Sequence, residues 1–246
     1  MVLEMCVDSL ESAKAAQEGG AQRVELCSAL AEGGLTPSFG MIGAVREALT
    51  IPVFVIVRPR GGAFSYSSEE FAVMKRDILA AKSHGADGVV IGVLRYDGTV
   101  DMERTRELVE LARPMSVTFH RAFDWTPQME EALEQIIEAG ADRILTSGGV
   151  ASALEASNQI SLLVKKAAGR IKIMVCGKVR AENIAEIAQK TSASEFHASL
   201  RKPKRSDINY HTTLVSLGEH DADDLVVYAV AAEDVRAMRN ALQSRE

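Results

Sequence analysis

The residues best suited to chemistry form two copies of one short pattern near the start of the chain. Glu4 and Cys6 close the first apolar run, and Glu25 and Cys27 close the second, 21 positions later. A helix-like segment over 9–18 separates the two runs, as a crossover between parallel strands requires. Side chains alternate between the faces of a strand, so each glutamate shares a face with its cysteine. Two thiols and two carboxylates are therefore expected to meet at the C-terminal ends of neighbouring strands, where α/β folds place their chemistry.

The cysteine pair, Cys6 and Cys27, leaves several interpretations open. The two thiols could simply be small buried apolar groups. A pair of thiolates is also a suitable ligand set for a soft ion such as Cu(I). A zinc site needs four ligands, so His120 or His197 would have to approach the pair. A nucleophilic thiol with a histidine base is a further alternative, although no local motif supports it.

Polar residues also follow two later strand-like runs. Arg58 and Arg60 come after the third run, and their fixed guanidinium donors suit a carboxylate or a phosphate. The alternative for Arg58 is an ion pair with a glutamate inside the fold. His120 ends the fifth run beside Arg121 and Asp124. A histidine in this position suits acid–base chemistry or metal binding, because its pKa lies near neutrality.

The sixth and eighth runs end in further candidates. Thr146 and Ser147 precede two glycines, and hydroxyls with glycine amides before a helix are typical of an anion site. The alternative is that they simply cap the helix. His197 lies near the end of the eighth run. Alternation along the strands predicts that eight residues face inward: Glu4, Cys6, Glu25, Cys27, Arg58, His120, Thr146 and His197. Buried charges are costly unless they are paired, so these groups are expected to form a largely self-neutralising network.

The elements that would position these residues alternate regularly. Strand-like runs are predicted at about 2–6, 22–27, 51–57, 87–93, 115–120, 142–146, 171–176 and 194–198. Helices are predicted at about 9–18, 38–48, 67–83, 101–112, 127–138, 150–168, 180–190 and 232–243. Eight βα units predict a single α/β domain over 1–246, a (β/α)8 TIM-like barrel with its site at the C-terminal mouth and a long loop at about 199–231. An open doubly wound sheet is the second choice, but no glycine-rich loop follows the first strand.

Composition narrows the class of protein. The chain has 246 residues, of which 47% are hydrophobic, and a net charge of −6. This charge argues against nucleic acid or an anionic membrane as the main partner. Three cysteines, with no visible signal peptide and no apolar run long enough for a membrane span, favour a cytoplasmic protein with free thiols. No motif for an organic cofactor is apparent.

Several motifs together resemble the CutC family, which is named for copper homeostasis. The matching segments are Leu3-Glu4-Met5-Cys6-Val7-Asp8, Val24-Glu25-Leu26-Cys27-Ser28-Ala29-Leu30, Glu32-Gly33-Gly34-Leu35-Thr36-Pro37-Ser38, Arg58-Pro59-Arg60-Gly61-Gly62, Thr118-Phe119-His120-Arg121-Ala122-Phe123-Asp124 and Leu145-Thr146-Ser147-Gly148. Two departures stand out. Ala63 takes the place of a common acidic residue, and Cys176-Gly177-Lys178 replaces a Gly-x-Gly turn.

The resemblance implies a TIM-barrel-like fold, a cytoplasmic setting (or, in a eukaryote, also a nuclear one) and self-association as a dimer or tetramer. It implies Cu(I) ligands at Cys6 and Cys27. The wider polar pocket that it implies comprises Glu4, Glu25, Arg58, His120, Arg121, Asp124 and His197. The resemblance assigns no role to Cys176 or to the basic stretch 201–205.

The leading hypothesis is a copper homeostasis protein that binds Cu(I) through Cys6 and Cys27. The alternative is a barrel enzyme acting on a small anionic or carbonyl metabolite, with Glu25 or His120 as acid or base and Arg58 holding the anion. A barrel that serves only as a scaffold is a third hypothesis. It predicts that removing the His120 side chain alters stability without altering the binding of any ligand.

Overall fold

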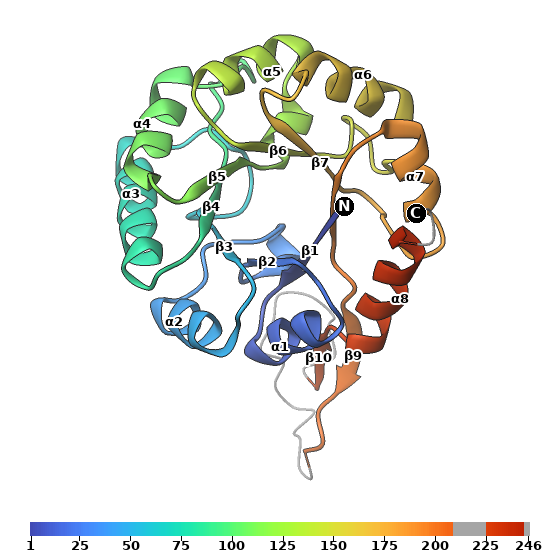
Figure 1. Cartoon of the computed structure of the whole chain (residues 1–246). Coiled ribbons are helices and arrows are strands. Elements are labelled where there is room, and N and C mark those ends of the chain that lie inside the picture. The colour runs from blue at the N-terminus through green and yellow to red at the C-terminus, as the bar shows by residue number, and fades with distance from the viewer. Residues whose placement is uncertain (209–224, 244–246) are drawn as a thin grey trace.

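The computed structural model describes residues 1–208 and 225–243, and these form a closed barrel (Figure 1). Eight parallel strands pair in sequence order, and β1 pairs with β8 to close the ring. The strands are β1 (Val2–Val7), β2 (Arg23–Leu26), β3 (Val53–Ile56), β4 (Gly88–Ile91), β5 (Ser116–Phe119), β6 (Arg143–Thr146), β7 (Lys172–Val175) and β8 (Glu195–Ala198). The predicted (β/α)8 barrel is confirmed, and the open sheet is wrong because closure leaves this sheet without edge strands.

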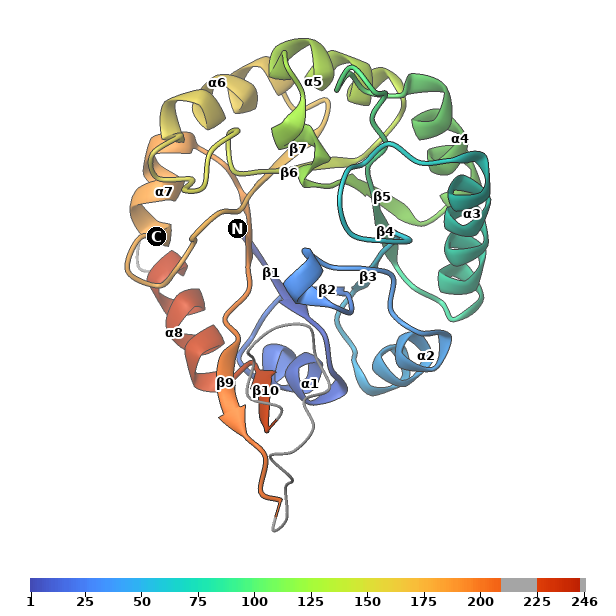
Figure 2. The same ribbon diagram turned by 180° about the vertical axis from the view of Figure 1, so that it is seen from behind.

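Helices surround the strands in an outer ring (Figure 1 and Figure 2). They are α1 (Leu10–Glu18), α2 (Phe39–Ala48), α3 (Ser68–Ser83), α4 (Met102–Ala112), α5 (Met129–Glu138), α6 (Ser157–Ala167), α7 (Ile184–Thr191) and α8 (Ala232–Gln243). Side-chain caps fix several starts, and Ser67 and Glu70 form a reciprocal capping box on α3. Among the described helices, none combines the length and the apolar character needed to cross a membrane.

Two helices begin later than predicted. Helix α6 begins at Ser157 rather than near position 150, and the connection before it opens with Gly148 and Gly149 at positive φ angles of 74° and 81°. Helix α7 begins at Ile184 rather than near 180. The extra residues lengthen the connections after β6 and β7, at the end of the barrel where the predicted site lies.

The segment 199–231 was predicted to be a loop, but it contains an antiparallel hairpin of β9 (Lys202–Arg205) and β10 (Val226–Ala229) (Figure 2). The charged, proline-containing sequence of β9 explains why no strand was predicted there. Positions 209–224 of the predicted loop lie outside the described residues. Salt bridges hold the hairpin side of the chain to the barrel, with Arg201 on Asp8 and Lys204 on Glu11, each at 2.8 Å.

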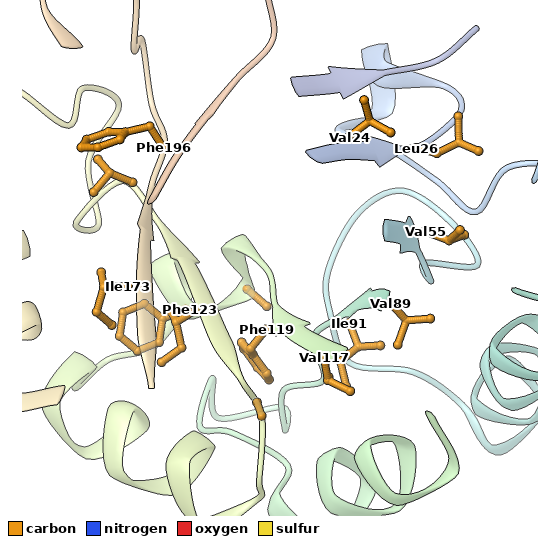
Figure 3. Packing of buried hydrophobic residues seen from close by; sticks show 14 of the residues in the cluster. Val24, Leu26, Val55, Val89, Ile91, Val117, Phe119, Phe123, Ile173 and Phe196 are labelled. Atoms are coloured by element: carbon orange, nitrogen blue, oxygen red, sulfur yellow. The ribbon is translucent and has the colours of Figure 1, made fainter. Parts of the chain in front are cut away.

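The main core lies between the strands and the helices. Outward-facing strand residues such as Val24, Leu26, Ile91 and Phe119 are buried against the helix ring, as Figure 3 shows for part of this cluster. Burial of each such side chain contributes roughly 1.5–3 kcal/mol, so this layer supplies most of the stability that keeps the barrel closed.

The lower part of the barrel interior is ionic rather than apolar. We call the four residues Glu4, Arg23, Arg143 and Glu195 the ionic belt. Arg23 hydrogen-bonds both glutamates, with a distance of 2.8 Å to Glu195, and Arg143 contacts Glu195 at 2.5 and 3.2 Å. Two cations balance two carboxylates, so the belt is neutral as a whole.

An aromatic ring fills the space between the two arginines of the belt. The guanidinium carbons of Arg23 and Arg143 lie 4.8 and 5.4 Å from the centre of the Phe54 ring. Gly88 faces the same ring, and a Cβ at this position would lie 2.7 Å from three ring atoms. The belt and Phe54 together close the barrel below the mouth, and this filled layer forms the base of the site.

Candidate functional site

A cavity of about 190 Å³ opens at the C-terminal ends of the strands. Its wall comprises Cys6, Glu25, Leu30, Gly33, Gly34, Ile56, Arg58, Phe64, His120, Arg121, Leu145, His197 and Ser199. This volume lies below the roughly 300–1,000 Å³ of pockets that hold drug-sized ligands, so any occupant must be small.

The two cysteines lie side by side on one wall. The Sγ atoms of Cys6 and Cys27 are 3.5 Å apart, and Cys27 also donates to the Val7 carbonyl at 3.3 Å. Both side chains are buried, but Cys6 reaches the cavity. The hydrogen bond with Cys27, burial and the charge of Glu25 raise the pKa of the Cys6 thiol well above its usual value. Cys6 is therefore a protonated thiol at neutral pH in this metal-free arrangement.

His197 joins the cysteines to the acidic groups. Its Nδ1 lies 2.7 Å from Glu4 Oε1, and its Nε2 lies 3.8 Å from Glu25 Oε2. Burial favours the neutral imidazole, but Glu25, a hydrogen bond with Cys6 and Glu4 outweigh it and raise the pKa of His197 well above its usual value. His197 is therefore an imidazolium between two carboxylates, which explains how the fold tolerates this buried acidic pair.

The two glutamates, Glu4 and Glu25, differ in how readily their carboxyl groups ionise. Burial alone would raise the pKa of Glu4, but Arg23 and His197 lower it to about 2. Burial raises the pKa of Glu25, and the nearby charge of His197 only partly offsets this effect. Glu4 is thus a fixed anion, whereas Glu25 is the carboxyl that exchanges a proton more readily at the cavity wall.

Three potential ligand atoms for a metal converge at this wall. One atom each from Cys6, Glu25 and His197 lies within 4.8 Å of the other two. Cys27 adds a second sulfur next to Cys6. Two sulfurs with a nearby imidazole suit a soft or borderline ion better than a hard one, because magnesium and calcium prefer oxygen ligands alone.

His120 lies on the opposite side of the mouth. Its Nδ1 accepts a hydrogen bond from the Ala122 backbone N–H at 3.0 Å. Burial and the charge of Arg58 lower the pKa of His120 to about 3. The imidazole is therefore neutral and carries its proton on Nε2, since a neutral ring with an accepting Nδ1 has no other place for it.

The predicted anion site after β6 is filled by the protein itself. The Asp124 carboxylate accepts from Thr146 Oγ1 at 2.5 Å, from the Ser147 and Gly149 backbone N–H groups at 3.1 and 3.2 Å, and from Arg121 Nε at 2.8 Å. Hydroxyls and glycine amides do bind an anion here, as the pattern indicated, but that anion is an internal carboxylate. Its role is to hold Arg121 at the cavity rim.

Comparison with known proteins establishes the family. The model of the CutC family matches residues 1–202. The chain belongs to the CutC family. A CutC family protein of Chromobacterium violaceum is 48% identical over 241 residues, which cover 98% of both chains. A copper homeostasis protein cutC homolog of Mus musculus is 45% identical over 238 residues, covering 97% of this chain and 87% of that one.

Solved structures agree with this assignment. CutC from Streptococcus agalactiae matches with a TM-score of 0.77 and 35% identity, over 80% of this chain and 97% of that one. Thiamine phosphate pyrophosphorylase from Pyrococcus furiosus matches with a TM-score of 0.57 and 16% identity, over 98% and 95% of the two chains. The second likeness concerns the barrel fold alone.

In this CutC family member, the predicted site residues divide into three groups. Those that line the cavity are Cys6, Glu25, Arg58, His120, Arg121 and His197. Those that contact a lining residue from behind are Glu4, Cys27, Asp124 and Ser147. Those placed elsewhere are Arg60, which pairs with Glu70 at 2.5 Å, and Thr146, which bonds Asp124.

Two of the sequence predictions for individual residues are wrong. Thr146 was expected to face inward, but its neighbour Leu145 takes that position and packs on Met174 and Cys176. The alternation was counted one residue out for this strand, and a shift of one residue reverses the face of every side chain. Arg58 was given an ion pair with Glu4 or Glu25 as its alternative role, but Arg23 fills that place.

Sequence reasoning also missed lining and supporting residues. Arg23 shares a strand face with Glu25 two positions later, so strict alternation could have placed it inside the barrel. Leu30 begins a 3-10 helix of three residues and Phe64 lies in a loop, and such short segments carry no periodic signal. Cys176 is buried away from the Cys6 and Cys27 pair, and burial raises its thiol pKa. It therefore offers a control for the pair.

Proposed function

We propose that this CutC family member binds Cu(I) through Cys6 and Cys27 in copper homeostasis. The observation that carries the proposal is the 3.5 Å separation of the two sulfurs at the wall of a cavity. Paired thiolates favour Cu(I) over harder ions. The relatives in Mus musculus and Homo sapiens bear the name copper homeostasis protein cutC homolog, which supports the same role.

The surrounding residues fit such an ion. Both thiols must lose their protons to bind a metal, so binding releases protons. The Nε2 of His197 and the carboxylate of Glu25 are the nearest additional donors. Zinc would need all four of these groups, whereas Cu(I) is satisfied by fewer. Replacing His197 should therefore lower the affinity for zinc more than the affinity for Cu(I).

An anaerobic Cu(I) titration against a competing chelator tests the proposal. Wild type should bind one equivalent, and Cys6→Ser and Cys27→Ser should each lose affinity by at least the 10–100-fold that even an outer-shell change costs. Cys176→Ser is the matched control, since it removes a buried thiol that lies outside the pair. Equal stoichiometry and affinity in wild type and both pair variants would reject copper binding at this site.

We propose a cytoplasmic setting and self-association as a dimer or tetramer. Three free cysteines fit a reducing compartment, because thiols persist there without forming disulfides. Light scattering on the purified chain tests the assembly, and a strictly monomeric mass at micromolar concentration would contradict it.

We propose, as a second candidate, an enzyme that acts on a small anionic or carbonyl metabolite. One specific observation favours it: the buried cation Arg58 and the proton-bearing His120 line the same cavity as Glu25, whose pKa is raised. Glu25 would serve as acid or base, and Arg58 would hold the anion. A metabolite screen by thermal shift tests this function, since a ligand at 100 times its Kd stabilises by about 2.7 kcal/mol. A screen without any hit that depends on Arg58 or His120 would count against it.

A further inference from the structure

One wall of the cavity carries a buried hydrogen-bond donor without an acceptor. His120 is 4% exposed, and its Nδ1 is engaged by the Ala122 N–H, so Nε2 carries the proton. Within residues 1–208 and 225–243, Nε2 has no hydrogen-bond partner. A buried donor left in this way destabilises a fold, and such groups are rare in native proteins. The position therefore calls for an acceptor that the chain itself does not provide.

Beside His120 lies a cation without a counter-ion. Arg58 is 5% exposed, and its two terminal nitrogens are bonded to backbone carbonyls of Glu32, Gly34 and Gly62 at 2.6, 3.1 and 2.9 Å. None of the carboxylates in the described ranges forms an ion pair with it. Carbonyl dipoles orient the guanidinium but leave its charge uncompensated, and an unpaired buried charge is costly. This side of the cavity therefore favours a negative charge.

Arg60, a second arginine in the same loop, serves as a comparison because its charge is compensated. Arg60 also bonds backbone carbonyls, at Gly61 and Ala63, and lies 5.1 Å from an aromatic ring centre, that of Tyr66. It differs in two respects, because it pairs with Glu70 at 2.5 Å and its side chain is 40% exposed. Arg58 likewise bonds backbone carbonyls and contacts an aromatic ring, but it lacks the carboxylate partner. The missing partner is therefore specific to the arginine that faces the cavity.

An aromatic side chain covers both groups. The Phe64 ring lies 4.9 Å from the His120 ring and 5.1 Å from the Arg58 guanidinium carbon. Trp125, which is 62% exposed, packs edge-on against Phe64 at 5.1 Å. A cation–π contact is weaker than a charge-assisted hydrogen bond, so an anion can take the place of the ring at Arg58. Phe64 and Leu30 would then contact the apolar part of the ligand.

We propose that the cavity binds a small monocarboxylate with an apolar body, whose carboxylate accepts from His120 and Arg58. This inference deepens the second function proposed above and is independent of copper binding. The opposite wall carries Glu25, which would repel a doubly charged phosphate more than a single carboxylate. The apolar walls formed by Leu30, Ile56 and Leu145 suit a short hydrocarbon chain, and the volume of about 190 Å³ limits its length.

Binding of butanoate and 2-oxobutanoate to the full-length, metal-free chain tests the proposal by calorimetry. Butanamide is the neutral control of equal shape, and inorganic phosphate is the control for a general anion site. The carboxylates should bind about 10–100-fold more tightly than butanamide, because a hydrogen bond to a charged group contributes enough free energy to change the affinity by this factor. Equal binding of butanamide, or binding of phosphate alone, would overturn the proposal.

Variants locate the site. Arg58→Gln and His120→Phe should each weaken butanoate by about tenfold or more, while the matched variant Arg60→Gln should leave its affinity unchanged. Because Arg58 also holds loop carbonyls, a second measurement uses wild type alone. Butanoate should shift the imidazole ¹⁵N resonance of His120 Nε2, and an unchanged resonance at saturating ligand would overturn the proposal even if the variants fail to fold.

The outcome separates this inference from the proposed functions. Butanoate binding that depends on Arg58 and His120, without conversion of any metabolite, would support the carboxylate site and reject the enzyme. The Cu(I) titration of Cys6→Ser and Cys27→Ser is unaffected by either result, because Cys6 lines another wall of the cavity and Cys27 lies behind it.

Discussion

Replacing Asp124 by alanine should destabilise the fold by about 3–5 kcal/mol, the cost of removing one partner from a buried charged network. The Asp124 side chain is 4% exposed, and its loss leaves the Thr146 hydroxyl and the Ser147 and Gly149 amides without their acceptor. The Thr146 and Ser147 donors are buried and each costs about 1–3 kcal/mol when it lacks an acceptor, whereas the Gly149 amide is exposed. Water that enters beside the half-exposed Arg121 would satisfy some of them, which brings the sum down to this range.

Urea unfolding at neutral pH, followed by circular dichroism, measures this change in the free energy of unfolding. Asp124→Asn keeps the volume and one oxygen, so it should lose about half as much. Arg121→Met removes a partner whose side chain is 51% exposed, and it should cost less than about 1 kcal/mol. The m value should stay constant across the series, which shows that stability alone has changed.

The result that refutes this reasoning is specific. A loss below about 1 kcal/mol for Asp124→Ala, at constant m, would mean that the donors find other partners and that the internal carboxylate is not what orders the turn after β6. A loss for Arg121→Met as large as that for Asp124→Ala would mean that the ion pair, rather than the backbone amides, supplies the stability.

Three further predictions concern the barrel interior. Burial and Arg58 lower the pKa of His120 from 6.5 to about 3, so as the pH falls this histidine is protonated in the unfolded chain before it is protonated in the folded one. The neutral His120 therefore contributes its full stability above about pH 6.5, and this contribution is lost as the pH falls toward 3. His120→Phe should flatten this part of a plot of unfolding free energy against pH, and an unchanged slope would contradict the neutral imidazole. Arg23→Met should cost about 3–5 kcal/mol in urea unfolding because it leaves the fully buried Glu4 carboxylate without its guanidinium, and a neutral outcome would show that the belt is dispensable. Gly88→Ala should cost about 1–3 kcal/mol, since its Cβ would lie 2.7 Å from the Phe54 ring, and a thermal midpoint equal to wild type would show that the ring can move.

The sequence predicted the barrel well because its signals are local and repeated. Alternating apolar runs and helix periods fix the strand and helix order, and the repeated Glu-x-Cys pattern puts both sulfurs on the inner face of neighbouring strands, where Cys27 lies two residues beyond the partner of Cys6. The hairpin of β9 and β10 was missed because its pairing joins segments that carry no apolar alternation. Periodicity cannot reveal strands that are held by pairing to each other and by salt bridges.

Site details depended on exact register and on tertiary partners. Thr146 was placed one residue out of register, which exchanged it with Leu145. The pattern around Ser147 predicted a site for a bound anion, but in the folded chain the Asp124 carboxylate occupies the donors there. The choice between Arg23 and Arg58 as the partner of Glu4 likewise depends on the register of β1 and β2, which sets Glu4 opposite Arg23 and which strand spacing alone does not give.

The ionic belt and Phe54, which lies between its arginines, fill the barrel interior below the mouth. The cavity is therefore closed on that side, and a bound molecule cannot leave through the N-terminal end of the barrel. Arrival and departure therefore share one route, at the C-terminal ends of the strands where Phe64 and Arg121 line the cavity. A copper ion and an organic acid would have to use that route in turn, and each would delay the other without sharing a single ligand atom.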